Sequence, residues 1–353
     1  MKRERCDILI AGAGPAGTSA AIAAAGKGVK VIVAERRGAV GIPIRCAEYI
    51  PKPLLGELKL PPTFVVQPVS GMRTFSANGS VKEIRAPGLI VSRARLDRML
   101  AEAAVRAGVE IRLSTRVLGR QMETVFLKGP DGSVTAIEPR VVIGADGPCT
   151  TVGRWIGSEN RNLMPAVQAQ VPLAAAMEIT EIYFDPEVFG GYCWLFPRGE
   201  RANVGLGLKR RKGRKLNLKE LLHRFIERMA REGKIEDRVL AYTAGWIPAD
   251  RPRRVVSGNV LLAGDAAGHT HSITGAGVSQ AVFCGRMAGD WAAEAVRKND
   301  LDLLEKYEAQ WRELFEDVLE RAFQRRRMLE AEWDRLDEIL PQCWVAFKEY
   351  YRG

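Results

Sequence analysis

The first 35 residues show a strand, turn, helix and strand pattern of apolar and small side chains. Residues 6–11 form a short apolar run, and residues 12–17 read Gly-Ala-Gly-Pro-Ala-Gly before an alanine-rich stretch. A second apolar run, residues 28–35, ends in Glu35. A buried strand, a tight glycine turn, a helix and a second buried strand ending in an acid are the parts of a Rossmann βαβ unit.

Patterns further along the chain predict a second sheet and several amphipathic helices. Short strand-like runs with turn residues between them occur over residues 60–87 and 164–208. Apolar positions repeat every three or four residues over 92–108, 217–231 and about 301–340. Asn217 and Glu220 are expected to cap the second of these helices, and Pro341 is expected to end the third.

These elements predict an α/β protein with an interleaved architecture. A Rossmann-like dinucleotide-binding domain is combined with a smaller α+β domain built on a sheet, and a helical region follows. The first domain is expected over 1–59, 88–155 and 256–298, the second over 60–87 and 156–255, and the helical region over 299–353.

The composition narrows the class of protein. Hydrophobic residues make up 46% of the 353 residues and charged residues 27%, which is typical of a globular protein. The formal net charge of +11 favours anionic partners, yet no zinc-finger spacing or aromatic-basic RNA motif occurs, so nucleic acid is not expected. Six scattered cysteines without a Cys-x-x-Cys pair fit a reducing cytoplasm. Asp7 and the Gly-Pro pair at 14–15 interrupt the apolar start, so we expect no secretory leader.

The glycine turn has the spacing of a nucleotide site. Gly12 permits the tight turn, Gly14 lets the backbone approach a pyrophosphate, and Gly17 lets the helix pack on the strand. Glu35 can accept hydrogen bonds from a ribose. A second glycine-rich turn, residues 264–279, lacks this fingerprint, but Asp265 at its strand end can hold a ribityl hydroxyl, so we expect both turns to serve one extended cofactor.

Several motifs then resemble a known family. The glycine fingerprint with its acid, "GADG" at 144–147 and "GDAAG" at 264–268 are similar to the FAD-binding pattern of p-hydroxybenzoate hydroxylase-like flavoproteins. Within that group the chain resembles the geranylgeranyl reductase family, on "RCAEYIPKPLL" at 45–55, "YCWLFPRGERANVGLG" at 192–207 and "ITGAGV" at 273–278. The Tyr-x-Trp-x-Phe-Pro pattern is the most specific of these motifs.

The resemblance implies FAD as the cofactor and gives roles to particular residues. Arg45, Cys46 and Ala47 are expected near the flavin, and Arg93 and Val117 around the adenine half. The residues expected to bind FAD are Gly12, Gly14, Pro15, Ala16, Gly17, Glu35, Arg36, Arg45, Cys46, Ala47, Arg93, Val117, Asp146, Asp265, Gly275, Gly277 and Val278.

The expected reaction is hydride transfer from reduced FAD to carbon–carbon double bonds of a prenyl chain on a lipid, quinone or pigment precursor. Candidate proton donors are Cys46, Tyr192, His269 and His271, and no metal site is expected. On a strand, alternate residues share one face, so an aromatic row would line an apolar tunnel, with glycines on the next strand leaving room above it. The row is Tyr192, Trp194 and Phe196, and the glycines are Gly205 and Gly207.

Other functions on the same scaffold stay open. The pattern also fits an aromatic monooxygenase or halogenase-like enzyme, or a flavin electron carrier to quinone. The aromatic row could likewise be a filled core in place of a tunnel. Ser272 stands where the family usually has a proline, so the local shape of the chain near the flavin stays open as well.

The expected reductant is NAD(P)H or a ferredoxin-like protein. The expected partner of the basic run 209–215 is an anionic membrane face.

Overall fold

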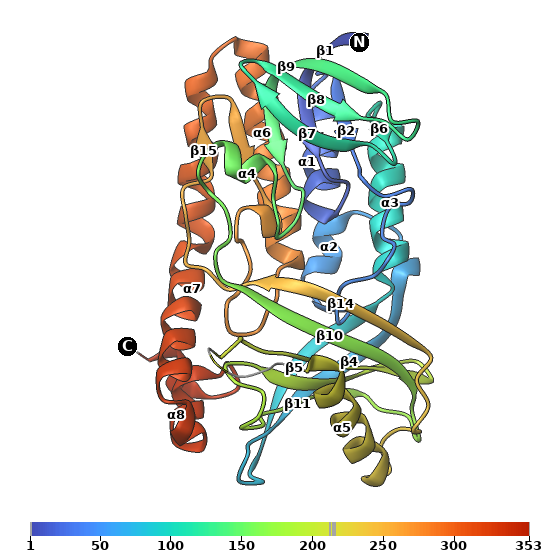
Figure 1. Cartoon of the computed structure of the whole chain (residues 1–353), viewed down its shortest axis with the longest axis vertical. Helices are drawn as coiled ribbons and strands as arrows, with labels where there is room; N and C mark the ends of the chain where they lie inside the picture. The colour runs from blue at the N-terminus through green and yellow to red at the C-terminus, as the bar shows by residue number, and fades with distance from the viewer. Residues whose placement is uncertain (1, 212, 214–216, 353) are drawn as a thin grey trace.

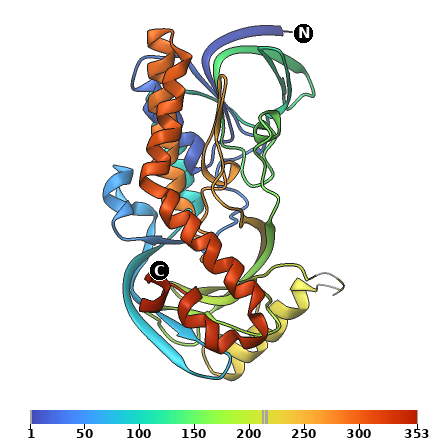
Figure 2. The same cartoon turned by 90° about the vertical axis from the view of Figure 1, so that its left-hand side faces the viewer.

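The molecule is elongated, with two sheets placed one beyond the other along its long axis (Figure 1). The figure shows a computed structural model that describes residues 2–211, 213 and 217–352. The first sheet lies at the end that carries the N-terminus, and the second lies at the opposite end with helix α5 against it. The long helix α7 runs beside both (Figure 2).

The first sheet confirms the Rossmann-like unit expected from the opening residues. Its strand order is β15-β16-β9-β1-β2-β6, and the strands from β16 to β6 are parallel. The antiparallel pair β7 and β8 extends it from β9. The strands are β1 (Lys2–Ala11), β2 (Val31–Ala34), β6 (Glu110–Arg112), β7 (Arg116–Gln121), β8 (Thr124–Lys128), β9 (Val134–Gly144), β15 (Val256–Ser257) and β16 (Val260–Leu262).

The second sheet confirms the sheet predicted for the middle of the chain. Its order is β14-β10-β13-β12-β11-β4-β5-β3, so β14 and β3 are its edges. The strands are β3 (Tyr49–Pro51), β4 (Val65–Phe75), β5 (Val81–Val91), β10 (Leu163–Pro172), β11 (Ile179–Tyr183), β12 (Tyr192–Arg198), β13 (Arg201–Gly207) and β14 (Ala241–Pro248).

The second sheet extends beyond the domain boundaries that were expected near residues 59 and 88. Ile50 of β3 pairs with Leu89 of β5, so residues 49–51 and 88–91 belong to the second sheet. The reason is antiparallel pairing: β5 continues past its hairpin with β4 and takes up β3 on its other side. Apolar content alone could not distinguish these residues from the first domain.

The helices form where apolar periodicity predicts them. Ser92 caps α3, and Asn217 caps α5, with its Oδ1 accepting from the Glu220 amide at 3.2 Å. Both capping side chains satisfy an amide that the helix itself leaves unpaired. The helices are α1 (Pro15–Ala25), α2 (Leu54–Leu58), α3 (Arg93–Arg106), α4 (Val152–Trp155), α5 (Leu218–Arg231), α6 (Val278–Lys298), α7 (Glu305–Ala331) and α8 (Leu336–Cys343), with short 3-10 turns at η1 (Pro62–Phe64), η2 (Gly264–Ala266), η3 (Leu301–Leu304), η4 (Trp333–Arg335) and η5 (Lys348–Tyr351).

The C-terminal helix does not run to Pro341 as expected. It breaks after Ala331, and Pro341 lies inside the separate helix α8. The 3-10 turn η4 buries Trp333 and turns the chain back, and this contact ends α7 before the proline is reached. Trp311 is fully buried on α7, whereas Leu314 is 54% exposed, so the apolar stripe on this helix is narrower than its sequence suggests.

Candidate functional site

Four parallel strands end at the same level of the first sheet. Ala11 is in register with Ala34 and with Gly144, and Leu262 is in register with Gly144. The residues that follow these strand ends therefore emerge side by side at one edge. In open α/β sheets this carboxyl edge is where ligands bind. The loops that begin at Gly12, Glu35, Ala145 and Ala263 thus form the floor of one site.

The glycines of the fingerprint, Gly12, Gly14 and Gly17, occupy two different kinds of environment. Gly12 has φ +99°, and a β-carbon there would lie 2.3 Å from the Ala145 carbonyl oxygen. A β-carbon on Gly17 would lie 1.9 Å from the Gly12 carbonyl oxygen. Gly14 instead has no atom within 4 Å of its missing β-carbon. Two glycines are therefore needed for the fold, and the third leaves open space for a ligand.

Two helix N-termini meet at this space. Gly14 is the N-cap of α1 and Gly277 that of α6, and neither helix has a side-chain cap or an acid in its first turn. The helices approach closely because β-carbons on Gly285 and Gly289 would meet the carbonyls of Ala16 and Ala20 at 2.2 and 2.1 Å. Free amides and the positive ends of two helix dipoles favour an anion such as a pyrophosphate.

Glu35 is fixed at the end of β2 by the turn that faces it. Its Oε2 accepts from the Ala13 amide and its Oε1 from the Arg37 amide, both at 2.9 Å. The Thr115 amide donates to the Glu35 carbonyl at 2.8 Å, which brings the start of β7 with Val117 beside it. Each carboxylate oxygen retains a lone pair for a ribose hydroxyl. Arg36 is exposed next to this carboxylate.

Asp265 lies in the turn η2 after β16. Its Oδ1 accepts from the Thr270 hydroxyl at 2.9 Å, and its carbonyl accepts from the Asn160 amide group at 2.8 Å. Burial raises the pKa of Asp265, and Thr270 and the charge of Arg93 oppose this shift. A β-carbon on Gly277 would lie 3.4 Å from Oδ1, so the acid sits against the start of α6.

The loop 271–277 is shaped by its glycines and by β14. Gly275 has φ +68°, and its missing β-carbon would lie 3.4 Å from Ile247 of β14. The His271 amide donates to the Ala276 carbonyl at 2.9 Å, which closes the loop on itself. Val278 then begins α6. The backbone of Gly275, Gly277 and Val278 therefore borders the same open edge as Asp265.

Cys46 and Ala47 are held by the second sheet. Gln168 donates to the Cys46 carbonyl at 3.2 Å, and Asn203 donates to the Ala47 carbonyl at 3.1 Å. The Glu48 amide donates to the Cys46 sulfur at 3.2 Å. These bonds connect the segment to β10 and β13, so it lies between the two sheets.

Glu48 is a buried acid that the sequence analysis missed. Its carboxylate accepts from the Arg93 amide at 2.9 Å, from Arg198 Nε at 2.7 Å and from the Asn203 side chain at 3.1 Å. Its backbone has φ +69°, a conformation that L-residues rarely adopt. The three donors hold Glu48 in this conformation and thereby fix the position of Cys46.

Arg93 is a buried residue at the start of α3. Its guanidinium forms a bidentate ion pair with Asp97, with distances of 2.9 and 3.0 Å. Burial lowers the pKa of Arg93, but Asp97 and Cys46 outweigh this effect and raise it above its ordinary value. Because Arg93 also acts on Cys46 and Asp265, it lies on the same side of the site as these two residues.

The aromatic row lies on the face of the second sheet that α8 covers. The Tyr192 hydroxyl donates to the Thr274 carbonyl at 2.5 Å, and Trp194 Nε1 donates to Gln168 at 2.9 Å. The Tyr192 ring packs on Trp344 with a centroid distance of 5.1 Å, and Phe196 packs on Tyr49. The row therefore joins the loop 271–277 to an apolar cluster formed with the C-terminal segment.

Known proteins are similar to this chain over most of its length. A family model described as an FAD binding domain matches residues 78–322. A digeranylgeranylglycerophospholipid reductase of Methanothrix thermoacetophila is 38% identical, with 88% of this chain and 83% of that one covered. The enzyme of the same name from Methanocaldococcus jannaschii is 32% identical, with 95% and 90% covered.

The chain belongs to the geranylgeranyl reductase family. A solved structure described as a geranylgeranyl bacteriochlorophyll reductase-like protein of Thermoplasma acidophilum has a TM-score of 0.87 and 27% identity, and 95% of this chain and 90% of that chain are covered. A flavin-dependent brominase has a TM-score of 0.75 at 18% identity, covering 97% of this chain and 96% of that one, and so shares the fold. The family and the fold expected from the motifs are both confirmed.

The two histidines expected as proton donors are buried and neutral in this family member. Burial, with the charges of Arg253 and Arg312, lowers the pKa of His269 to about 3, and its ring packs on Trp311. Burial lowers the pKa of His271 to about 4. His271 Nδ1 lies 3.3 Å from the Thr274 amide and must accept from it, so its proton is on Nε2, 3.0 Å from the Tyr350 hydroxyl.

The surroundings of Asp146, Arg45 and Gly205 fit the roles predicted for them only in part. Asp146 accepts from the Thr150 hydroxyl and the Thr151 amide, so its carboxylate caps the turn before α4. Arg45 is exposed and packs its stem near Gly245 of β14. Gly205 does not leave room above the aromatic row, because its missing β-carbon would lie 2.3 Å from the Trp194 ring, which fills that space.

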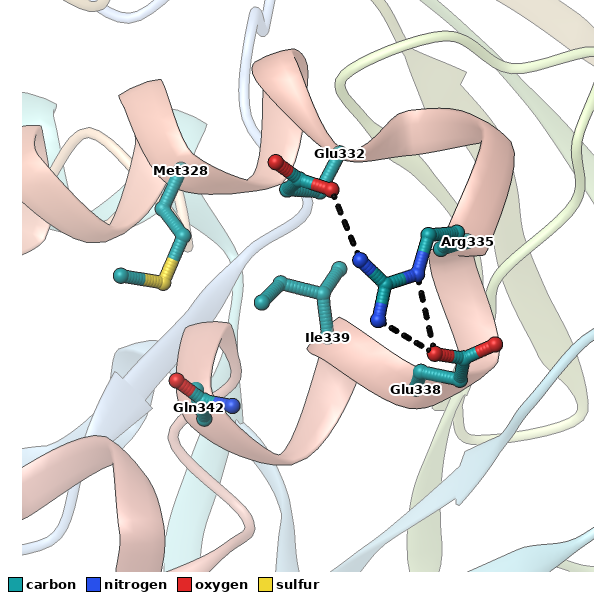
Figure 3. A pocket seen from close by; sticks show the side chains of 6 residues that line it. All are labelled: Met328, Glu332, Arg335, Glu338, Ile339 and Gln342. Atoms are coloured by element: carbon teal, nitrogen blue, oxygen red, sulfur yellow. Dashed lines mark hydrogen bonds and ion pairs between the residues drawn. The ribbon is translucent and has the colours of Figure 1, made fainter.

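A hollow in the surface near the C-terminus is not this site. It lies between the end of α7 and α8, where Arg335 bridges Glu332 and Glu338 (Figure 3). It is lined by Met328, Glu332, Arg335, Glu338, Ile339 and Gln342. None of these residues belongs to the motifs, and α8 lies at the end of the molecule away from the first sheet (Figure 1).

Proposed function

We propose that this FAD-dependent oxidoreductase reduces the prenyl double bonds of a glycerophospholipid that carries geranylgeranyl chains. The observation that carries the proposal is the position of the Cys46–Glu48 segment. It connects the carboxyl edge, where Arg93 and Asp265 lie, to the aromatic row through Gln168, which accepts from Trp194. The relatives named digeranylgeranylglycerophospholipid reductase support the choice of substrate class.

The residues present fit an FAD molecule. The open space at Gly14 and the free amides of α1 and α6 suit its pyrophosphate. Glu35 would hold a ribose, and Asp265 would hold the ribityl chain. The backbone of the loop 271–277 would border the ring system. When bound in its reduced form, FAD supplies a hydride to an alkene carbon.

A proton must reach the other alkene carbon, and Cys46 is the best placed of the expected donors. If its sulfur gave up a proton, the Glu48 amide and the Arg93 guanidinium would stabilise the resulting charge. The Tyr192 hydroxyl already donates a hydrogen bond to the Thr274 carbonyl, and burial raises the pKa of Tyr192. His269 and His271, with pKa values of about 3 and 4, are uncharged near neutral pH and have no imidazolium proton to give, so we assign them to loop structure.

The apolar face beside the site would exclude water from the alkene and orient the chain. The rings of Tyr192 and Phe196 border that face, the Trp194 ring packs beneath it on Gly205, and Trp344 packs on Tyr192. The single glycine fingerprint supports an external reductant, either NAD(P)H or a ferredoxin-like protein, that binds transiently.

Peripheral attachment to a membrane follows from such a substrate. None of the described helices is long and apolar enough to span a bilayer. Within the basic run 209–215, residues 209–211 and 213 are described, and Lys212, Arg214 and Lys215 lie outside the described residues.

The test is anaerobic incubation of the dithionite-reduced, FAD-loaded protein with a geranylgeranyl glycerophospholipid. Mass spectrometry should show a gain of two hydrogens for each reduced bond. Cys46→Ser should keep FAD and lose most of this turnover, with Cys149→Ser, an exposed thiol, as its control. Oxygen-dependent hydroxylation with no hydrogenated product would support the monooxygenase alternative and reject the proposal.

A further inference from the structure

Strand β14 presents different chemistry on its two faces. It is one of the two edge strands of the second sheet (Figure 1). Residues 243, 245 and 247 are partly buried, while residues 242, 244 and 246 are exposed. Such alternation is expected of a strand with one covered face. The open face, however, carries large aromatic side chains in place of the charges that usually protect an edge.

The covered face of β14 contacts the flavin site. The Thr243 hydroxyl donates to the Ile44 carbonyl at 2.6 Å. Gly245 packs on Arg45, since its missing β-carbon would lie 3.6 Å from the Arg45 Cβ. Ile247 packs on Gly275 of the loop beside α6. The strand is therefore the outer wall of the region where Cys46 and the loop 271–277 lie.

The open face of β14 is apolar and basic. Tyr242 is 55% exposed and Trp246 is 40% exposed, and both point to the side of the sheet that α5 covers only in part. The Arg210 guanidinium lies 5.8 Å from the Trp246 ring centroid. On the covered side of the same edge, Ile42 is 51% exposed next to the exposed Arg45, so the edge carries apolar and basic side chains on both of its sides.

The charges of this surface are free to meet an anionic partner. The neighbours of Arg210 are already paired: Lys209 with Glu330 and Arg211 with Asp334. In the part of the chain that the structure describes, no ion pair joins Arg210 to a carboxylate. A second copy of a chain with a net charge of +11 would be repelled here. Tyrosine and tryptophan prefer the headgroup region of a bilayer, where basic side chains also find anionic lipid.

We infer that the β14 edge surface, formed by Ile42, Arg45, Arg210, Tyr242 and Trp246, docks the enzyme on an anionic lipid bilayer. Docked in this way, the loop Ile42–Cys46 lies at the headgroups, and the prenyl chain of a lipid has a short route past β14 to the aromatic row. The inference rests on the proposed function, because only a substrate held in a bilayer needs this orientation.

Vesicle flotation of the full-length, FAD-loaded protein tests the docking surface. Vesicles of phosphatidylcholine with phosphatidylglycerol should bind the protein, and vesicles of phosphatidylcholine alone should bind it much less. Arg210→Glu should weaken binding at least about fivefold, since each basic residue near an anionic surface contributes roughly 1 kcal/mol. The double variant Tyr242→Ser, Trp246→Ser should weaken binding by a similar factor. Matched controls are Arg106→Glu and the double variant Leu314→Ser, Val318→Ser, which alter exposed residues elsewhere.

Activity measurements separate this inference from the proposed function. The surface variants should reduce a detergent-dispersed prenyl lipid as fast as wild type and a vesicle-embedded one more slowly. Equal losses in both assays, or equal binding by surface and control variants, would overturn the inference. A dimer of the wild type that the surface variants abolish would also overturn it, in favour of self-association. If vesicles bind as expected but no prenyl lipid is reduced in either assay, the proposed function fails and the surface stands.

Discussion

Single residues at the cofactor edge divide into those that shape the fold and those that leave space for a ligand. Gly12 and Gly17 have no room for a β-carbon, because backbone atoms lie within 2.3 Å of where it would be. Gly14 has room, and its φ of −74° suits any residue. The same motif thus contains two separate requirements that can be tested independently.

We predict that Gly17→Ala and Gly14→Ala fail in different ways. Gly17→Ala should destabilise the protein, since the new methyl would overlap the Gly12 carbonyl, and overpacking costs about 1–3 kcal/mol or more. Gly14→Ala should fold with nearly wild-type stability but bind FAD at least about tenfold more weakly, because its methyl enters the space for the pyrophosphate. Urea unfolding of both apoproteins and flavin titration give the two quantities. Tight FAD binding by Gly14→Ala would show that the pyrophosphate lies elsewhere.

The buried histidines make stability depend on pH. The folded pKa of His271, about 4, lies below its unfolded value of 6.5. The unfolded chain therefore binds the proton more strongly, and stability is lost as the pH falls below 6.5. At pH 5 the loss for this one histidine is roughly 2 kcal/mol. Chemical denaturation at pH 7 and pH 5 should show a smaller difference for His271→Asn than for wild type, while His223→Asn, at an exposed position of α5, serves as the control. An unchanged difference in His271→Asn would contradict the buried, neutral state.

At the scale of elements, β12 and β13 form the wall beneath the apolar face. Trp194 pairs with Gly205 across the strands, and its ring occupies the space that a side chain at 205 would take. Only 7% of Trp194 is exposed. The large and small residues are complementary, so the Trp194 ring is part of the packed core at this point.

We therefore predict that Trp194→Ala lowers the free energy of unfolding by about 3–5 kcal/mol, as large-to-small core changes do. Trp246→Ala, on the exposed face of β14, should change it by less than about 0.5 kcal/mol. Urea unfolding of the FAD-loaded variants measures both. A Trp194→Ala variant that keeps its stability and loses only turnover would mean that this ring lines a tunnel.

Local patterns predicted the parts of the fold that depend on neighbours in sequence. The turn 12–17, the capped helix α5 and the alternation in β12 each follow from a short window. Contacts between distant residues could not be found this way: Glu48 meets Arg198 150 residues away, and nothing in the sequence around either marks the pair. Alternation gave the face of Trp194 correctly, but it could not tell whether the facing glycine left a gap or was already covered.

At the scale of the whole molecule, α7 is the element that connects the two sheets (Figure 2). Near its start, the Tyr307 hydroxyl donates to the Leu262 carbonyl at 2.7 Å, at the end of β16. Near its end, Arg326 donates to the carbonyls of Ser272 and Gly190 and pairs with Glu330. One helix therefore contacts the end of β16, the loop 271–277 and the second sheet.

We predict that Arg326→Leu both destabilises the protein and speeds the loss of FAD. Removing one partner of a buried ion pair costs about 3–5 kcal/mol, and here two carbonyls also lose their donor. Arg327→Leu, on the exposed side of α7, should do neither. The measurements are the urea midpoint and the rate of flavin release on dilution. Release at the wild-type rate from a destabilised Arg326→Leu would mean that the loop is held by other contacts.

The contacts of α7 also fix its rotational phase. Tyr307 and Arg326 must face the core together, although about five helical turns separate them. Inserting one residue between them would rotate one end against the other by about 100°, turning either the tyrosine or the arginine toward solvent. Chains of this architecture can therefore gain or lose residues in exposed turns such as 130–133, but the spacing along α7 can change only by lengths that restore its phase.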